Sequence, residues 1–139
     1  MAKKRELVER LGAVPLFSRC SRRELQIVAR HTEIADVPQS AVLVTEGEKG
    51  DAFFVVLAGR ARVSRGGRAK GTLEAGGYFG ELALLDPAPR SATVKAETDV
   101  QVGVLGARMF RILLRELPAI SERLLAGLAR ELREAQRSR

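Results

Sequence analysis

The spacing of hydrophobic positions divides the chain into a helical beginning, a strand-like middle and a helical end. Residues 6–11 have helical spacing that stops near Gly12. Ser21, followed three residues later by Glu24, has the pattern of a capping box and predicts that a second helix begins there. An apolar stripe over residues 25–29 supports this second helix.

From about Ile34 the spacing becomes strand-like, and Gly and Pro become frequent. This pattern is typical of short antiparallel strands. Gly66-Gly67 lies between two such segments and supplies the positive φ angles that a tight hairpin requires. Many strands at close intervals favour a barrel or jelly roll. The predicted strands cover residues 41–45, 53–57, 60–64, 69–73, 93–95 and 100–105.

The helical period returns at Ala107 and is interrupted at residues 116–118, because Pro118 lacks a backbone N–H and restricts the residue before it. A last amphipathic helix is predicted over residues 119–136. We interpret its apolar stripe as facing the core, with a dimer interface as the alternative. The stripe consists of Ile120, Leu124, Leu125, Leu128 and Leu132.

A chain of 139 residues with 45% hydrophobic residues suits one domain with one core. It has no apolar run of about 18 residues, and it begins with an amphipathic segment rather than a secretion signal. We therefore expect a cytoplasmic protein that does not bind a membrane. A single cysteine, Cys20, and a single histidine, His31, are too few for an internal disulfide or a dedicated zinc site. Both are interpreted as structural, and no metal or catalytic group is expected.

The net charge of +7 raises the alternative of a nucleic-acid-binding protein. Residues 1–30 hold eight Lys/Arg against three Asp/Glu, and residues 108–139 hold eight against four. Residues 31–107 carry eight basic and ten acidic side chains. We interpret the basic ends as solvated helix faces, because 4% aromatic residues leave few rings for base stacking. DNA is therefore not the expected partner.

The segment that follows Gly80 combines features that suit a small phosphate ester. Gly80 precedes a short helical turn whose free N–H groups, around Leu82 and Ala83, can attract an anion. Arg90 offers a planar guanidinium to two phosphate oxygens. Glu81 only accepts hydrogen bonds when ionised, so it would seek a hydroxyl donor. The alternative is an ion pair between Glu81 and Arg90 that simply holds the loop.

The order of residues in this segment is that of a known motif. Residues 79–84 and 89–93 match the pattern Phe-Gly-Glu-Leu/Ile-Ala-Leu, a short variable stretch, and Pro-Arg-Ala/Ser/Thr-Ala-Thr. That pattern is the phosphate-binding cassette of the cyclic nucleotide-binding domain family, which the chain closely resembles. Residues 45–59 resemble the family's Glu-Gly…Gly-Asp…Phe/Tyr-x-Val/Ile-x-x-Gly hairpin, and residues 14–25 resemble its N-terminal segment. The resemblance covers nearly the whole chain.

The resemblance implies a mainly β fold with flanking α-helices in a single domain over residues 1–139. N-terminal helices would occupy residues 1–33, an eight-stranded antiparallel jelly-roll barrel (double-stranded β-helix) residues 34–106, and C-terminal lid helices residues 107–139. The ligand would be cAMP in preference to cGMP, with no further cofactor. Arg90 would pair with the phosphate and Glu81 with the ribose 2′-hydroxyl. The ligand-binding residues carried over from the cassette are Phe79, Gly80, Glu81, Leu82, Ala83, Arg90, Ser91 and Ala92.

We therefore expect a sensor or regulatory domain, not an enzyme, that signals when its last helix changes position over the ligand. The output would go to an effector protein or to a homodimer formed through that helix. Leu128, Leu132 and Gln136 are the candidates for the side chain that touches the base. Two alternatives stay open: an interaction or dimerisation module without a ligand, and a basic nucleic-acid-associated protein.

Overall fold

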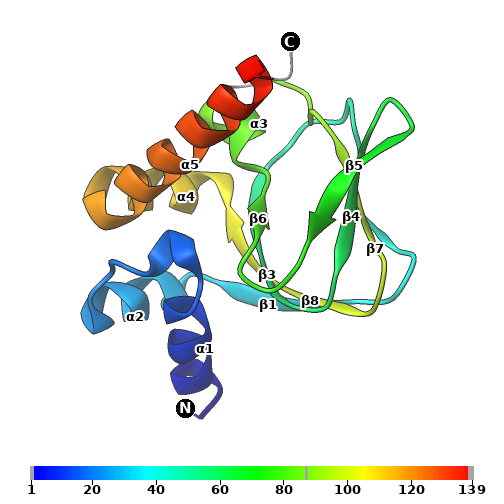
Figure 1. Cartoon of the computed structure of the whole chain (residues 1–139). Helices are drawn as coiled ribbons and strands as arrows, with labels where there is room; N and C mark the ends of the chain where they lie inside the picture. Colours follow the sequence, from blue (N-terminus) through cyan, green and yellow to red (C-terminus); the bar gives the residue numbers. More distant parts are fainter. Residues whose placement is uncertain (1, 87, 138–139) are drawn as a thin grey trace.

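The computed structural model describes residues 2–86 and 88–137 of the chain. Helices at both ends flank a body of strands, and a short helix lies between the sixth and seventh strands (Figure 1). The helices are α1 (Ala2–Gly12), the 3-10 turn η1 (Pro15–Phe17), α2 (Arg22–Arg30), α3 (Glu81–Leu85), α4 (Ala107–Glu116) and α5 (Pro118–Arg137). The strands are β1 (Glu33–Val37), β2 (Val42–Val44), β3 (Ala52–Ala58), β4 (Ala61–Arg65), β5 (Arg68–Leu73), β6 (Tyr78–Phe79), β7 (Thr93–Ala96) and β8 (Val100–Gly106).

The eight described strands form two antiparallel sheets of four strands each, in the orders β1-β8-β3-β6 and β2-β7-β4-β5. In the first sheet, residues 52–56 of β3 pair with residues 102–106 of β8. In the second, Gly66 and Gly67 connect β4 to β5 with φ angles of 60° and 77°, as the sequence predicts. The sheets form a roll but do not join edge to edge into a closed barrel. The predicted antiparallel jelly roll with flanking helices is confirmed.

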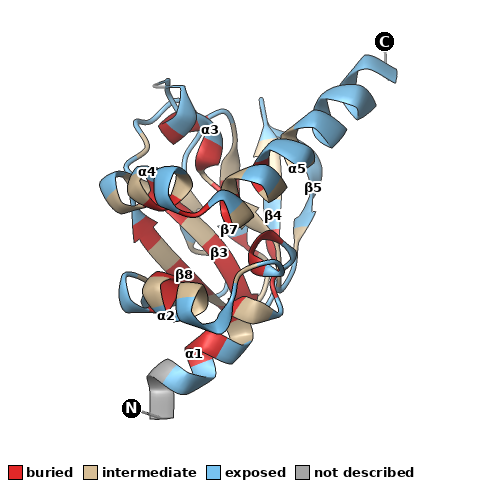
Figure 2. Ribbon diagram, turned by 90° about the vertical axis from the view of Figure 1, so that its left-hand side faces the viewer, coloured by how far each residue is buried: buried red, intermediate tan, exposed pale blue. Residues whose placement is uncertain are grey.

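Strand β3 separates two hydrophobic clusters, because successive side chains of a strand point to opposite faces. Phe53, Val55 and Leu57 belong to a cluster that includes buried residues of α1, α2, α4 and α5. Val56 belongs to a second cluster, built from strands of both sheets. The Phe53 ring stacks on Phe110 of α4 with a centroid distance of 4.5 Å. The helices are therefore packed against the outer face of the sheet whose inner face lines the roll (Figure 2).

Helix and strand boundaries follow local signals in the sequence. The Ser21 N–H donates to Glu24 Oε1 (2.8 Å) and the Glu24 N–H donates to Ser21 Oγ (3.1 Å), which confirms the capping box. α4 ends at Glu116 and α5 begins at Pro118, which confirms the predicted interruption. Each predicted strand is present to within one residue at either end. The sequence pattern does not delimit β1 or β6.

The apolar stripe of α5 faces the core only in part. Ile120 and Leu124 are buried and Leu128 is half-buried, but Leu125 and Leu132 are 65% and 61% exposed. The prediction that the stripe faces the core is therefore wrong for Leu125 and Leu132. Leu125 is exposed although it follows the buried Leu124, and Leu132 belongs to the C-terminal half of α5. Figure 2 shows that this half of the helix is exposed and projects away from the roll.

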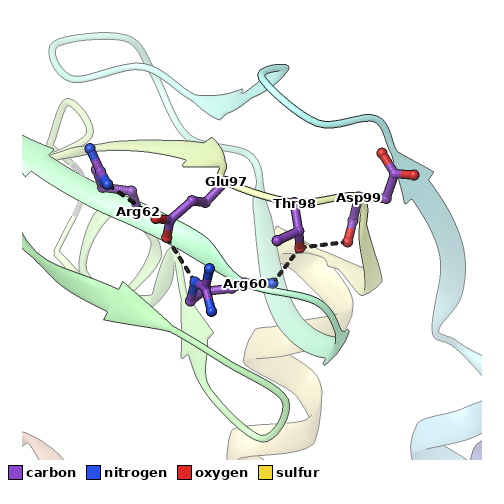
Figure 3. A network of polar contacts seen from close by, with 5 residues as sticks. All are labelled: Arg60, Arg62, Glu97, Thr98 and Asp99. Carbon is purple, nitrogen blue, oxygen red and sulfur yellow. Dashed lines mark hydrogen bonds and ion pairs between the residues drawn. The ribbon is translucent and has the colours of Figure 1, made fainter.

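A polar network ties the β3–β4 turn to the β7–β8 turn (Figure 3). Glu97 accepts hydrogen bonds from Arg60 Nε (2.9 Å) and Arg62 Nη2 (3.1 Å). The hydrogen bond from Arg60 is the main reason that the pKa of Glu97 lies below its ordinary value. Gly59 has a φ of +87°, and a Cβ atom there would lie 2.2 Å from the Asp99 carbonyl oxygen, so this turn requires glycine.

Candidate functional site

Gly80 turns the chain from β6 into α3. Its φ angle is +99°, which disfavours any residue with a side chain. A Cβ atom at this position would also lie 2.8 Å from the Ala52 carbonyl oxygen and 2.9 Å from Arg90 Nη1. Both the backbone conformation and the close approach of Arg90 therefore require glycine here.

The first turn of α3 presents free backbone N–H groups. The N–H groups at the start of a helix have no carbonyl partner within it, and in α3 these include the N–H groups of Leu82 and Ala83. The Gly80 cap has no side chain to accept from them. These N–H groups are available for an external acceptor.

Arg90 lies at the centre of the site and is only 6% exposed. Its Nη1 donates to the Gly80 carbonyl oxygen (3.1 Å) and its Nη2 to the Ala52 carbonyl oxygen (2.9 Å). The Cζ atom lies 5.8 Å from the centroid of the Phe54 ring. These two bonds leave three of the five guanidinium N–H groups available. Arg90 makes no ion pair with Glu81 in the described part of the chain, so the alternative of an ion pair that holds the loop is wrong.

The loop at residues 46–50 encloses the backbone and side chain of Arg90. The Arg90 N–H donates to the Glu48 carbonyl oxygen (2.7 Å), and the Gly47 N–H donates to the Arg90 carbonyl oxygen (2.9 Å). A Cβ atom at Gly50 would lie 2.4 Å from Arg90 Cζ. The absence of a side chain at Gly50 therefore leaves room for the guanidinium. The two sequence motifs therefore meet at Arg90.

Glu81 is a buried carboxylate with an unsatisfied oxygen. The residue is 7% exposed, and its Oε2 atom accepts no hydrogen bond in the described structure. Burial raises the pKa of Glu81 to about 7, and the nearby Glu131 raises it further, while its own backbone N–H and Arg90 lower it. A buried acceptor without a partner is unfavourable unless a donor arrives. Glu81 is therefore ready to accept from a ligand hydroxyl.

All eight residues predicted from the cassette line one cavity of about 190 Å³. Its charged groups are those of Arg65, Glu81, Arg90 and Glu131, and the roll supplies an apolar wall. The predicted residues in the lining are Phe79, Gly80, Glu81, Leu82, Ala83, Arg90, Ser91 and Ala92, and the apolar wall adds Val44, Val63, Leu73 and Val94.

Helix α5 reaches this cavity through Glu131, which the sequence reasoning missed. Of the three lid candidates, Leu128 packs against the first hydrophobic cluster, while Leu132 and Gln136 are exposed, and none of them lines the cavity. A Cβ atom at Gly127 would lie 2.9 Å from the Tyr78 hydroxyl, so this glycine lets α5 approach β6 closely. Glu131 lies one helical turn after Gly127 and shares its face. An isolated glycine inside a helix was the signal that could have identified Glu131.

Tyr78 lies between the cavity and α5. Burial is the main reason that the pKa of its hydroxyl is raised to about 12, with further increases from Glu81 and Glu131. The hydroxyl is therefore neutral over the physiological range and can act as a hydrogen-bond donor.

One family sequence pattern, that of the cyclic nucleotide-binding domain, matches residues 34–116. The match covers more than half of the chain and includes the roll, the cassette and α4. The chain belongs to the cyclic nucleotide-binding domain family. The eight residues that the sequence motif predicts all line one cavity in this structure.

Similar proteins agree with this assignment. The cAMP-dependent protein kinase regulatory subunit of Mycosarcoma maydis is 36% identical over 132 residues, which cover 88% of this chain and 25% of that protein. The solved structure of Sp-2Cl-cAMPS bound to PKAR CBD2 has a TM-score of 0.83 at 31% identity and covers 97% of this chain and 92% of the other. The Thermus thermophilus catabolite activator protein has a TM-score of 0.83 at 33% identity, over 89% of this chain and 61% of the other. The chain spans about a quarter of the length of the kinase regulatory subunits that it matches.

Other chemically reactive residues of this cyclic nucleotide-binding domain lie outside the cassette cavity. Burial raises the pKa of the Cys20 thiol to about 11, with a smaller contribution from Glu24, so the thiol stays protonated at neutral pH. His31 is exposed at the C-terminal end of α2. Among the described residues, no group of three or more His, Cys, Asp or Glu side chains could hold a metal ion. None of the described helices is long and apolar enough to cross a membrane.

Proposed function

We propose that this chain binds a cyclic nucleotide in the cassette cavity and acts as a sensor or regulatory domain rather than as an enzyme. The observation that carries the proposal is a buried carboxylate oxygen without a partner, on Glu81, beside a buried guanidinium with free N–H groups, on Arg90. A ribose carrying a cyclic phosphodiester presents a hydroxyl donor and an anion close together. Such a ligand satisfies both groups at once.

Each cassette residue has a distinct role in this proposal. The free N–H groups of Arg90 donate to the exocyclic phosphate oxygens, and Glu81 accepts from the ribose 2′-hydroxyl. Backbone N–H groups at the start of α3 donate to the phosphate. The backbone donors are those of Gly80, Leu82 and Ala83, Ser91 adds a hydroxyl, and Phe79 and Ala92 complete the wall.

Within this proposal, cAMP is preferred to cGMP. The support comes from relatives whose names or structures specify cAMP, among them the cAMP-dependent protein kinase regulatory subunits and the Thermus thermophilus cyclic AMP receptor protein. Glu131 is the polar side chain that α5 brings to the cavity. Its carboxylate can accept from the N6 amino group of adenine or the N2 amino group of guanine, so both nucleotides belong in the first experiment.

The output of the domain is proposed to pass through α5. This helix contributes Glu131 to the cavity and packs on Tyr78 through Gly127. A ligand that contacts Glu131 therefore adds a contact to α5 and shifts the equilibrium between positions of this helix. Leu125 and Leu132 on its exposed surface are available to an effector protein or to a second copy of the chain. The cytoplasmic location expected from the sequence stays a prediction.

Calorimetric titration with cAMP and then with cGMP tests the proposal. The chain is first unfolded and refolded to remove nucleotide that co-purifies with it. Binding with a Kd of about 1 μM or tighter supports the sensor function and ranks the two ligands. Absence of binding to both would favour the interaction module without a ligand. Binding to DNA that weakens steeply with salt, in place of nucleotide binding, would favour the nucleic-acid alternative.

A further inference from the structure

A second concave surface lies beside α3, outside the cassette cavity. We call it the α3–α4 groove, and it has a volume of about 490 Å³. Its apolar lining comes from Leu84 and Leu85 of α3 and from Ile112 and Leu114 of α4. Leu84 is buried and the two α4 residues are half-buried, whereas Leu85 is 43% exposed. The groove therefore has an apolar floor with one accessible apolar edge.

Three arginines of α4 border this floor. Arg108, Arg111 and Arg115 all line the groove and are exposed. Their spacing of three and four residues places them along one face of the helix. Within the described part of the chain, none of the three makes a salt bridge or a side-chain hydrogen bond. The groove thus carries three positive charges that the domain itself does not neutralise.

We propose that the α3–α4 groove docks an amphipathic segment of a partner protein that carries acidic residues beside its apolar ones. An apolar floor with a border of one sign of charge is complementary to a helix with Leu-like anchors flanked by Asp or Glu. Arginine suits this task because its guanidinium can hold a carboxylate through two parallel hydrogen bonds.

Other occupants fit the groove less well. A single-stranded nucleic acid would require aromatic side chains for base stacking, and the lining contains none. A membrane surface would require several apolar side chains that project outward, whereas Leu84 is buried, Ile112 and Leu114 are half-buried, and Leu85 is the one exposed apolar residue of the lining. A second copy of this chain is disfavoured at this groove, because it carries a net charge of +7 and would meet three arginines that the domain does not neutralise.

The groove shares α3 with the cassette cavity. Glu81 and Ala83 line the cavity, while Leu84 and Leu85 line the groove. A partner bound in the groove and a ligand bound in the cavity therefore contact the same five-residue helix. On this basis each changes the affinity of the other, by the same factor in both directions. This coupling, unlike the docking itself, rests on the proposed function.

The test starts from a phage-displayed library of random peptides of about 16 residues, a length at which helix formation is possible. The library is selected on the refolded full chain. Enriched peptides are then titrated by fluorescence anisotropy against the groove variant, Arg108→Glu with Arg111→Glu and Arg115→Glu. The matched control reverses three exposed arginines of another helix, Arg22, Arg23 and Arg30 of α2, and changes the net charge equally.

We expect enriched peptides to have apolar residues at helical spacing with Asp or Glu beside them. Their affinity should fall at least about tenfold for the groove variant and stay within about twofold for the control. Leu85→Ser, at an exposed position, should weaken the same peptides without reversing any charge. No enrichment, peptides without an acidic bias, or equal losses in both triple variants would overturn the proposal. Binding to phosphatidylserine vesicles that depends on the three groove arginines, with no peptide enriched, would overturn it in favour of a membrane surface.

A repeat of the titration with saturating cAMP separates docking from coupling. A severalfold change in peptide affinity supports the coupling. Unchanged peptide affinity in a chain that does bind cAMP overturns the coupling and leaves the docking intact. A chain that binds the peptide but no cyclic nucleotide contradicts the proposed function instead.

Discussion

The Glu81→Gln variant measures how far the buried carboxylate in the cassette cavity lowers the free energy of unfolding. Burial raises the pKa of Glu81 from its ordinary value of 4.5 to about 7. Between these two values the folded chain holds a proton that the unfolded chain has already released, so the free energy of unfolding falls as the pH rises through this window. A pKa difference of about 2.5, at about 1.4 kcal/mol for each unit of pH, gives a loss of about 3.5 kcal/mol that is complete above pH 7. Glutamine has a similar shape and does not titrate.

We therefore expect the Glu81→Gln variant to be more stable than the wild type at pH 8, by about 1–3 kcal/mol. The gain stays below the full figure because the new amide N–H groups also need partners. At pH 4.5 the difference should vanish or change sign. Urea unfolding followed by far-UV circular dichroism at several pH values measures the free energy of unfolding of each protein. The nucleotide-free protein is used throughout.

The control for this experiment is Glu74→Gln, which neutralises an exposed glutamate. Its profile should run parallel to that of the wild type over the whole pH range. If the Glu81→Gln profile also ran parallel to the wild type between pH 4.5 and 7, Glu81 would not carry a raised pKa and the electrostatic account of the cavity would be refuted. The same variant should bind cyclic nucleotide about tenfold more weakly, because a neutral amide oxygen is a poorer acceptor than a carboxylate.

Three further substitutions test the cavity by titration calorimetry. Arg90→Ala should lose roughly 2–5 kcal/mol of cyclic nucleotide binding, and unchanged affinity would contradict its role at the phosphate. Gly50→Ala should also weaken cyclic nucleotide binding, because its Cβ would lie 2.4 Å from Arg90 Cζ. The control Gly106→Ala, whose Cβ would have no atom within 4 Å, should bind with the affinity of the wild type. Equal affinities of the two variants would refute this account. Glu131→Ala should weaken cGMP at least as much as cAMP, since a carboxylate accepts from either base, and an unchanged affinity for both nucleotides would show that Glu131 does not reach the base.

Local patterns predicted the elements whose stability is local. The Ser21–Glu24 capping box and Pro118 fix helix ends through bonds within a few residues, so their positions follow from the sequence. Strand β6, in contrast, has two residues and exists only because it pairs with β3. Its period cannot be recognised in so short a segment.

The cassette residues were predictable because they follow one another in a motif, while the residues that complete the site were not. Gly50 approaches Arg90 only after β3 and the cassette fold together, so its role requires the tertiary structure. Glu131 comes from a helix whose apolar stripe drew attention to Leu128 and Leu132 instead. From the sequence alone, a charged residue beside an apolar stripe is interpreted as exposed to solvent. The cavity that Glu131 lines is known only from the structure.

The shortness of α3 explains how one element can respond to ligands at both of the proposed binding sites. A helix of five residues without a side-chain cap has little stability of its own, so contacts on its two sides set its position. On one side are Glu81 and Ala83 at the cavity, and on the other are Leu84 and Leu85 at the groove. Arg90 donates to the carbonyl oxygen of Gly80, the residue that precedes the helix, so movement of the guanidinium toward a phosphate also changes what holds the start of α3. The coupling free energy between two sites is typically about 1–3 kcal/mol. A change of this size can shift the position of a short, marginally stable helix, whereas a long, well-packed helix would stay in place.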